Sequence, residues 1–434
     1  MKRFLIILFI TILHISALSA QKRWTLAQCI EHGLQHNLSI RQMQGENEQL
    51  HIREQALRNN RFLPNVEFGT SQRFNLGRSL NRENVYEDVS SHITNASLQA
   101  EMLLFDGFHT RHALRENHAT IRASEESMQA RKDDLKLNIA NLFYRAAIHK
   151  EIHQIAIEQR QLTKEQILRV EARIEAGTAP ESLLLEMHAQ LAEDELNVIE
   201  TRGNVNMALI ELARWINLTE GVEYFDIIVE SENELLPLLR NGQEVQTNLF
   251  PQIRMEQHRL ESLEWAYQRT RSNRLPTLVL GGSIGSTYFN HSRMTDSPFG
   301  EQFRNNAQTL FYATLRVPIF DRFSTRNNLR TVRIDIQNQQ IALQESKNIL
   351  QIETLQIRTN LQNAIQRLQA SNESVAAHEE VFRFATEMFN AGRMSAYEHL
   401  LARQRLANSQ SQAAQARFNL AYQSFVYKHY HRQY

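Results

Sequence analysis

The sequence contains few of the two residues that interrupt regular secondary structure. It has 14 glycines and 7 prolines in 434 residues, whereas glycine and proline together make up about 12% of an average protein. Neither residue occurs in the stretches 108–176 and 319–391. β-sandwiches, propellers and doubly wound sheets need turns far more often than this. The scarcity therefore excludes those folds as the main architecture and predicts long helices.

Cysteine is almost absent, and neither sign of charge is in excess. Cys29 is the single cysteine, so the chain can form no internal disulfide and no paired-cysteine metal site. We predict that it is a small apolar residue of the first helix. The 48 basic residues balance 48 acidic ones, which leaves no electrostatic footprint for nucleic acid. We expect no nucleic-acid partner, no resident metal and no cofactor.

The N-terminus has the pattern of an export signal. Met1-Lys2-Arg3 is a basic start, residues 4–12 are apolar, and residues 16–20 are small enough for cleavage. The apolar run is too short to be a membrane span, and no later run reaches the length that a transmembrane helix needs. An exported chain of this kind is secreted, periplasmic or an outer-membrane β-barrel.

Three short landmarks occur twice, in the same order. They are the pairs Leu63-Pro64 and Leu275-Pro276, Phe105-Asp106 and Phe320-Asp321, and Ala176-Gly177 and Ala391-Gly392. The second and third landmarks are the same distance apart in both copies, which predicts two copies of one structural unit. We divide the chain into a signal peptide at 1–20, repeat 1 at 21–217, a linker or equatorial segment at 218–243, repeat 2 at 244–428 and a tail at 429–434.

Each repeat has the same predicted order of elements: lead-in helices, a strand pair, a long helix, a glycine turn and a return helix. In repeat 1 the strand pair lies at about 62–105, the long helix at about 109–176 and the return helix at about 180–216. In repeat 2 they lie at about 275–320, 324–391 and 395–428. Apolar residues in the second long helix form two stripes at coiled-coil spacing: Leu343, Leu350, Ile357, Leu361, Ala364 and Leu368, and Ile341, Ile349, Ile352 and Leu355.

The strand segments alternate between apolar and polar residues. Each is about as long as the 9–11 residues of a tilted transmembrane strand, and the alternation is typical of an outer-membrane barrel. The residues that we expect to face lipid are Val66, Phe68, Leu98, Phe311 and Leu315. Four strands cannot close a barrel, and open edges are not tolerated in lipid. Either three chains supply twelve strands, or the four strands pack among themselves in a soluble protein.

In its ordered motifs the mature chain resembles the TolC family of outer-membrane efflux proteins. The motifs are the two Leu-Pro pairs, Val317-Pro318-Ile319-Phe320-Asp321, Asn37-Leu38, Asn248-Leu249 and the two Ala-Gly turns. Two departures are local: the first strand-to-helix transition lacks the proline, and the glycine pair after Phe-Asp reads Gly107-Phe108 and Arg322-Phe323. The resemblance implies a mainly α fold in which two repeats form long antiparallel coiled-coil helices and four transmembrane strands. Three chains then form a 12-stranded barrel and a periplasmic α-barrel.

The resemblance also implies a function and partners. A homotrimer in the outer membrane, extending into the periplasm of a Gram-negative cell, would conduct substrates outward from a periplasmic adaptor and an inner-membrane pump, in efflux or type I secretion, without enzymatic activity. Drugs, metal ions, peptides and proteins are all possible cargo. The alternative is a soluble periplasmic coiled-coil adaptor or scaffold.

The same resemblance places the functional positions at the two hairpin tips. Glu398 lies six residues after Gly392, where family members often carry an acidic residue that lines the closed aperture. Leu183 is the matching position after Gly177, so Glu181 and Glu186 are only nearby candidates. A ring of three Glu398 side chains would favour cations in a narrow pore, whereas the structural alternative is an ordinary exposed helix residue. The tip candidates for adaptor contact are Gly177, Thr178, Arg173, Gly392, Arg393 and Met394.

Two other motifs suggest chemistry less strongly. The run Gly281–Gly285 fits the nucleophile elbow of a hydrolase, with Ser283 at its centre, but an elbow must join a strand to a helix and this run lies in a strand pattern. His149 and His153 have the spacing of two metal ligands on one helix face, without an evident third ligand. We therefore predict no catalytic residue and no metal site.

Overall fold

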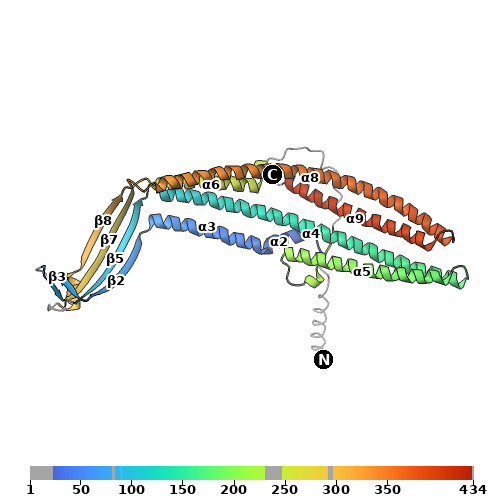
Figure 1. The fold of residues 1–434 in the computed structure, drawn as a ribbon, viewed down its shortest axis with the longest axis horizontal. Coiled ribbons are helices and arrows are strands. Elements are labelled where there is room, and N and C mark those ends of the chain that lie inside the picture. Colours follow the sequence, from blue (N-terminus) through green and yellow to red (C-terminus); the bar gives the residue numbers. More distant parts are fainter. Residues whose placement is uncertain (1–22, 81–83, 89, 230–246, 292–296, 433–434) are drawn as a thin grey trace, which may run out of the picture. The chain divides into compact units, whose positions relative to one another are not determined.

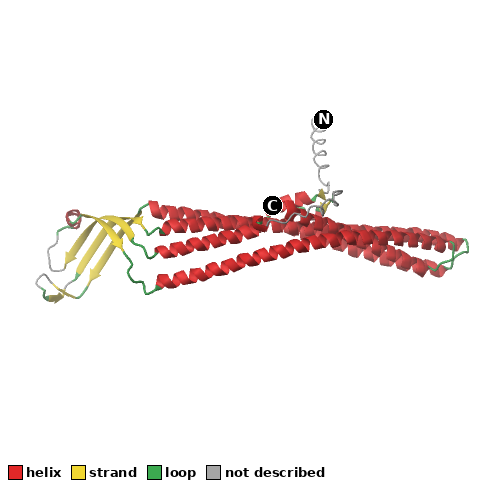
Figure 2. Cartoon of the chain, turned by 90° about the horizontal axis from the view of Figure 1, so that it is seen from above, coloured by secondary structure: helices red, strands yellow, loops and turns green. Residues whose placement is uncertain are grey.

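The structure is a computed structural model that describes residues 23–80, 84–88, 90–229, 247–291 and 297–432. Helices predominate in these residues, and the longer strands form one group (Figure 2). The predicted mainly helical class with a smaller strand component is confirmed. The predicted signal peptide, residues 230–243 of the predicted linker and the last two residues of the predicted tail lie outside the described residues.

Among the described residues, no helix is both long enough and apolar enough to span a membrane.

The segment assigned to repeat 1 contains strands that the sequence does not predict. They are β1 (Arg23–Trp24) and a small hairpin between the two long strands, formed by β3 (Arg78–Leu80) and β4 (Tyr86–Asp88). The other elements are α2 (Leu26–His36), α3 (Leu38–Phe62), β2 (Asn65–Asn75), β5 (Ser91–Phe105), α4 (His109–Glu175) and α5 (Glu181–Trp215). At about 1.5 Å per residue, the 67 residues of α4 span roughly 100 Å.

Repeat 2 has a similar order, but a short helix lies between its two strands. Its elements are η3 (Thr247–Leu249), α6 (Pro251–Ser272), β7 (Thr277–His291), α7 (Phe299–Asn305), β8 (Gln308–Arg316), α8 (Ser324–Asn390) and α9 (Ala396–Arg432). The prediction of a tail from residue 429 is wrong for its first four residues, because α9 continues to Arg432. The aromatic residues there are packed: Tyr430 contacts Phe250, and His431 stacks on Tyr427.

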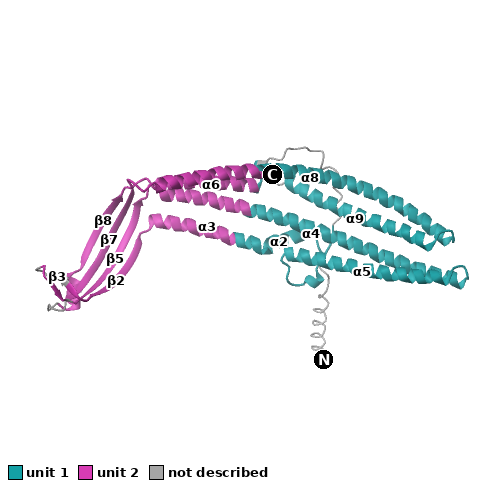
Figure 3. Ribbon diagram, in the orientation of Figure 1, with its two compact units in different colours: residues 1–43, 128–251, 347–434 teal, residues 44–127, 252–346 magenta. Residues whose placement is uncertain are grey.

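The chain forms two compact units that do not coincide with the two repeats (Figure 3). Unit 1 comprises residues 1–43, 128–251 and 347–434, and unit 2 comprises residues 44–127 and 252–346. Each unit takes segments from both predicted repeats. The two long helices contribute residues to both units.

The main core of unit 1 joins α2, α4, α5 and α9. Phe143, Ile139 and Leu212 are buried at its centre with Cys29, which lies on the first helix as predicted. At Gly33 a Cβ atom would lie 2.5 Å from Ile139 Cδ1, so a larger residue there would require the Ile139 side chain to move. The first part of the predicted linker belongs to this core too: β6 (Asp226–Ile227) pairs in parallel with β1 (Arg23–Trp24).

The two apolar stripes of α8 have different environments. Leu350, Ile357, Leu361 and Ala364 of the first stripe are buried, the last three in a cluster with α9. In the second stripe Ile349, Ile352 and Leu355 remain exposed, Ile352 by 57%. On α5 a comparable exposed series comprises Leu185, Leu196, Ile199, Met207 and Ile210. Unit 1 therefore has two separate apolar helix faces without a partner in the described chain.

Unit 2 contains an antiparallel sheet of four strands in the order β2–β5–β7–β8 (Figure 1). The pairing of β5 with β7 joins the two repeats. β2 and β8 are the sheet edges. Side chains two residues apart share a face of a strand, so the register assigns every residue of the sheet to one of two faces.

The two turns from strand to long helix have the same construction. Asp106 accepts a hydrogen bond from the backbone N–H of Thr110 at 2.7 Å, and Asp321 accepts one from Thr325 at 2.7 Å. Each carboxylate thereby satisfies an N–H group that the first helical turn leaves free. The two residues after each aspartate have positive φ angles, 66° and 67° after Asp106 and 54° and 63° after Asp321.

Candidate functional site

The two hairpin tips end in the same backbone turn. Gly177 and Gly392 have φ angles of 69° and 72°, the left-handed conformation in which glycine carries no steric cost. The next residues, Thr178 and Arg393, donate their backbone N–H groups to the carbonyls of Arg173 and Met388, at 2.8 and 2.9 Å. This pattern is the Schellman motif, which satisfies the last carbonyls of a helix.

The candidate residues of the first tip are mostly exposed. Glu181 is the first residue of α5, and Glu186 lies one turn later; both side chains are exposed and have no hydrogen-bond or ion-pair partner among the described residues. Thr178 is committed to the turn, because its hydroxyl donates to the Arg173 carbonyl at 3.0 Å. Pro180 precedes α5 and offers no side-chain cap.

The second tip differs because the side chain of its acidic candidate, Glu398, is held by hydrogen bonds. Ser395 and Glu398 form a capping box: the Glu398 carboxylate accepts from the Ser395 backbone N–H at 3.1 Å, and the Glu398 N–H donates to the Ser395 hydroxyl at 3.3 Å. The Ser395 hydroxyl also donates to the carboxylate at 2.8 Å. These hydrogen bonds lower the pKa of Glu398, so the exposed carboxylate is charged at neutral pH.

Arg173 links the two tips. Its guanidinium donates to the Phe389 carbonyl at 3.4 Å and lies 5.8 Å from the Phe389 ring centre. Phe389 packs with Met187 of α5 in an apolar cluster that Met394 also contacts. Arg393 is exposed. Of the six tip candidates for adaptor contact, Arg173 and Met394 therefore connect the hairpins, whereas Arg393 faces solvent.

A buried polar group behind the tips has no counterpart among the sequence predictions. Arg403 of α9 forms an ion pair with Asp194 of α5 at 3.2 Å, with side-chain exposures of 5% and 10%. Arg403 also donates to the hydroxyl of Thr163 on α4, and this hydroxyl donates to Asp194. No sequence signal identifies this group, because its members belong to three helices and have no characteristic spacing.

His399 lies one turn before Arg403 on α9. It is almost fully buried, stacks on Phe389 with ring centres 4.8 Å apart, and its Nε2 atom lies 3.1 Å from the Thr386 hydroxyl. Burial, together with the positive charge of Arg403, lowers the pKa of His399 to about 4. The imidazole is therefore neutral at physiological pH.

The sheet register assigns the five predicted lipid-facing residues to one face. Phe68 pairs with Leu98, and Leu98 pairs with Ile284 on the next strand. Val66 pairs with Ala100, Ala100 with Gly282, and Gly282 with Phe311. Leu315 shares the face of Phe311, whose side chain is 81% exposed. We call this face, which includes Val66, Phe68, Leu98, Ile284, Phe311 and Leu315, the apolar face.

The opposite face of the sheet is predominantly polar. It carries Glu67, Gln99, Glu101, Ser283 and Tyr312. Tyr312 of β8 reaches across β7 to donate a hydrogen bond to Glu101 of β5. This contact requires Gly281, because a Cβ atom there would overlap the Tyr312 ring.

The glycine-rich run of β7 is therefore structural. Tyr312 covers Gly281 on the polar face, and Phe311 lies over Gly282 on the apolar face, 3.0 Å from where its Cβ atom would be. Ser283 lies inside β7 rather than at a strand-to-helix turn, so it lacks the geometry of a nucleophile elbow.

Among the residues that the structure describes, no third ligand side chain joins the histidine pair of α4. His153 contacts the Thr201 hydroxyl at 3.0 Å. Burial lowers the pKa of both His149 and His153, and neighbouring arginines lower it further. The described residues contain no group of three or more potential ligand side chains around a common point.

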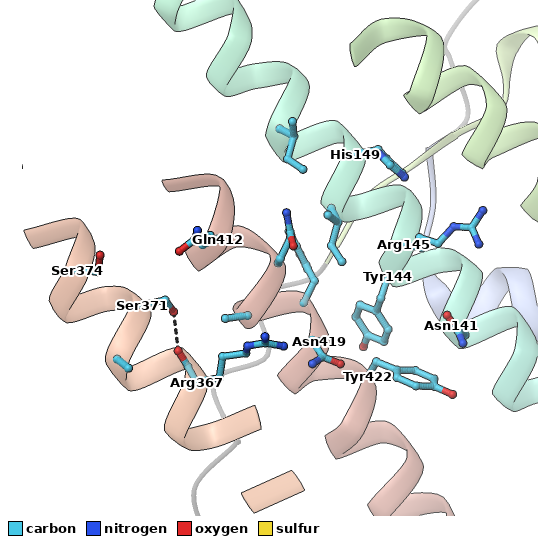
Figure 4. A pocket seen from close by; sticks show the side chains of 16 residues that line it. Asn141, Tyr144, Arg145, His149, Arg367, Ser371, Ser374, Gln412, Asn419 and Tyr422 are labelled. Atoms are coloured by element: carbon cyan, nitrogen blue, oxygen red, sulfur yellow. Dashed lines mark hydrogen bonds between the residues drawn. The ribbon is translucent and has the colours of Figure 1, made fainter. Parts of the chain in front are cut away.

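His149 also lines a cavity of about 930 Å³ between α4, α8 and α9 (Figure 4). Its other polar residues include Arg367, Ser371, Asn419 and Tyr144, and no carboxylate of the described chain lines it. The Ser371 hydroxyl donates to the Arg367 carbonyl of its own helix at 2.7 Å.

A sheet with one apolar face and two open edges, joined in sequence to two long helical hairpins, defines the subunit of an outer-membrane channel. The family model of outer membrane efflux proteins matches residues 30–218 and 248–424. The chain belongs to this family, and the predicted resemblance is confirmed. The first matched segment covers most of predicted repeat 1, and the second covers most of predicted repeat 2.

Known proteins with similar sequences or structures agree with this assignment. Protein CyaE of Bordetella pertussis is 24% identical over 250 residues, a match that spans 56% of this chain and half of that protein. The structure of CusC superposes with a TM-score of 0.78 at 16% identity, over 93% of this chain and 91% of that one. The CmeC outer membrane channel of Campylobacter jejuni gives 0.76 at 17% identity, over 93% and 85%.

Proposed function

We propose that this protein is the exit duct of a tripartite efflux or type I secretion system, located in the outer membrane and extending into the periplasm. The observation that carries the proposal is the apolar face of a sheet that a single chain leaves open at both edges. Open edges in lipid leave backbone groups without hydrogen bonds, so the sheet requires further strands from other copies.

A cyclic homotrimer satisfies this requirement. β8 of one copy would pair with β2 of the next, and twelve strands exceed the minimum of about eight for a closed membrane barrel. The exposed apolar residues of unit 1 support the same assembly, because α5 and α8 carry two different unpartnered faces. Two different faces on one subunit suit a head-to-tail ring rather than a two-fold dimer. A soluble monomeric scaffold would leave both faces in water.

The tips are the proposed contact with a periplasmic adaptor, which in turn binds an inner-membrane pump. The motifs of the TolC family imply these partners, and CusC and CmeC, which share the fold, form membrane channels. Arg393, Glu181 and Glu186 are exposed at the tips and are therefore available for polar contacts. We propose them as contact residues, with the Schellman turns at Gly177 and Gly392 fixing the shape of the surface.

Cell fractionation and bilayer recordings test the duct. We expect a heat-resistant trimer in the outer-membrane fraction and stable conductance from the purified protein in planar bilayers. Recovery of a water-soluble monomer would contradict the proposal and favour the scaffold alternative. A matched pair of substitutions tests the face assignment: Phe311→Arg should prevent trimer insertion because Arg is costly on a lipid face, whereas Leu310→Arg, one residue away on the opposite face, should permit it.

We propose that Glu398 also lines the closed aperture. Glu398→Gln retains a side-chain oxygen that can accept the capping-box hydrogen bond but removes the charge, and we expect reduced cation selectivity. Ser395→Ala is the control, because it removes the cap while leaving the charge. If Ser395→Ala alters selectivity and Glu398→Gln does not, the residue acts through helix capping only, and its aperture role is wrong.

A further inference from the structure

Where β8 ends, a helix rather than a strand lies along the edge of β7. β7 has 15 residues and β8 has nine, and their pairing stops at Gly285 and Gln308. The six remaining residues of β7, 286–291, have no β8 partner. The short helix α7 lies there, at the ends of the strands (Figure 2).

α7 provides hydrogen bonds that a longer β8 would otherwise supply. The Asn306 side chain, directly after α7, donates to the Thr287 carbonyl at 2.6 Å. The Phe289 backbone N–H donates to the Gln302 side chain at 3.2 Å. In addition, the Ser286 hydroxyl donates to the Phe303 carbonyl. A helix that satisfies edge groups in this way is a known protection for a strand edge.

The contacts place α7 on the apolar face. Ser286 and Tyr288 share that face with Ile284, because they follow it at two-residue intervals. Ser286 is 7% exposed beneath α7, whereas Ile284 is 59% exposed. The covered surface is thus continuous with the surface that we expect to face lipid.

A row of aromatic rings extends across this end of the apolar face and onto α7. Phe74 of β2 stacks on His92 of β5 with ring centres 4.5 Å apart, and the ring centres of His92 and Tyr288 of β7 are 6.0 Å apart. Tyr288 contacts Phe299 of α7 at 5.0 Å, and Phe299 stacks on Phe303 at 5.3 Å. Phe299 nevertheless remains 51% exposed. Aromatic residues at the end of an apolar strand surface are typical of a membrane–water interface.

We propose that α7 is an interfacial helix on the outside of the barrel, which inserts Phe299 among the lipid headgroups of the outer leaflet. The inference rests on the proposed function, since it requires the apolar face to contact lipid. It adds a contact with lipid that strands alone do not make. Polar residues of α7, Glu301 and Arg304, are exposed beside the rings, as an interfacial position requires.

Spin labels on introduced cysteines test this position in the complete trimer, reconstituted into vesicles of phospholipid and lipopolysaccharide. The native Cys29 does not interfere, because it is buried and its thiol pKa is raised to about 12. Labels at Phe299→Cys and Gly300→Cys report on α7. Labels at Phe311→Cys and Leu310→Cys report on the apolar and polar faces of β8. The readout is collision with oxygen, which concentrates in lipid, relative to a water-soluble nickel chelate.

We expect Phe311→Cys to favour oxygen strongly, Leu310→Cys to favour the chelate, and Phe299→Cys to lie between them on the oxygen side. Gly300→Cys retains both phenylalanines and should report a shallow interfacial position even if Phe299→Cys weakens the helix. If the β8 labels behave as expected but both α7 labels match Leu310→Cys, α7 is in water and this inference is wrong. If the two β8 labels exchange environments, the face assignment of the proposed function fails instead.

Discussion

Arg403 of α9 and Asp194 of α5 form a buried ion pair at 3.2 Å that joins the return helices of the two repeats. Thr163 of α4 completes the group through hydrogen bonds to both partners. Gln190 donates at 2.9 Å to Oδ1 of Asp194, whereas Thr163 donates to Oδ2. A buried charge depends on such partners, because its desolvation costs several kcal/mol.

Removing one member of this ion pair should destabilise the protein more than removing both. Arg403→Met leaves a buried carboxylate without its cation, and we expect a loss of about 3–5 kcal/mol in the free energy of unfolding. Arg403→Met combined with Asp194→Leu should recover most of this loss, because apolar replacement of a buried pair is often neutral. Denaturant titration of the wild type, both single variants and the double variant measures the coupling. If the loss in the double variant equals the sum of the losses in the two single variants, Arg403 and Asp194 have no coupling energy.

His399 should make the stability of the tips depend on pH. Its folded pKa of about 4 lies below the value of about 6.5 in an unfolded chain. The contribution of neutral His399 to the free energy of unfolding is complete above pH 6.5 and is lost as pH falls toward 4. In this interval the unfolded chain binds a proton at His399 that the folded chain does not. We expect a loss of roughly 3 kcal/mol over this interval.

The corresponding measurement is the thermal unfolding midpoint between pH 7 and pH 4. His399→Gln keeps a side chain that can bond to Thr386 but does not titrate, so its unfolding midpoint should fall less than that of the wild type over the same interval. Equal pH dependence of the two proteins would assign the effect to other groups.

The glycine of a hairpin tip should tolerate alanine poorly. Gly392→Ala places a Cβ atom in the left-handed conformation, at φ 72°, and we expect a loss of about 1 kcal/mol in the free energy of unfolding. Gly203→Ala is the matched control, because Gly203 lies inside α5, where an added Cβ atom would have no neighbour within 4 Å. It should instead stabilise the protein by about 0.5–1 kcal/mol. Similar effects of both substitutions would contradict the assigned turn.

Substitution of the residue after the aspartate should change the free energy of unfolding in opposite directions in the two strand-to-helix turns. Arg322 has φ 54° where repeat 1 has Gly107 at 66°. Arg322→Gly relieves left-handed strain but increases unfolded-chain entropy, so we expect a net gain of about 0.5 kcal/mol. Gly107→Ala should cost more than about 1 kcal/mol, because its Cβ atom would also lie 2.7 Å from Leu275 Cβ. Thermal unfolding of both variants decides whether the turns are strained.

Several parts of the fold can be predicted from the sequence because they depend on local spacing. The absence of glycine and proline bounds α4 and α8 closely, and the two-residue alternation of β2 and β8 assigns Phe68 and Phe311 to one face. The capping box at Ser395 and Glu398 also has a sequence signature, although the family resemblance points only to its acidic member. Such signals involve residues within one or two turns of each other.

Other features depend on contacts between distant segments. Nothing near Arg403 indicates that Asp194 lies beside it, because that proximity requires the two hairpins to pack together. Helix α7 is absent from the sequence prediction because seven residues show too little periodicity, although Pro298 before it is a common start signal. The continuation of α9 to Arg432 follows from the packing of Tyr430 on Phe250, which sequence spacing does not reveal.

The open edges at β2 and β8 have a consequence for how the protein is made. In the proposed trimer, a single chain cannot reach its lowest free energy in a membrane, so insertion of the sheet and association of the copies would be one thermodynamic event. The yield of functional protein should then rise steeply with its local concentration during biogenesis. A subunit that meets no others would expose the same edges to proteases and to misassembly, which makes subunit supply a control point for the amount of duct in the cell.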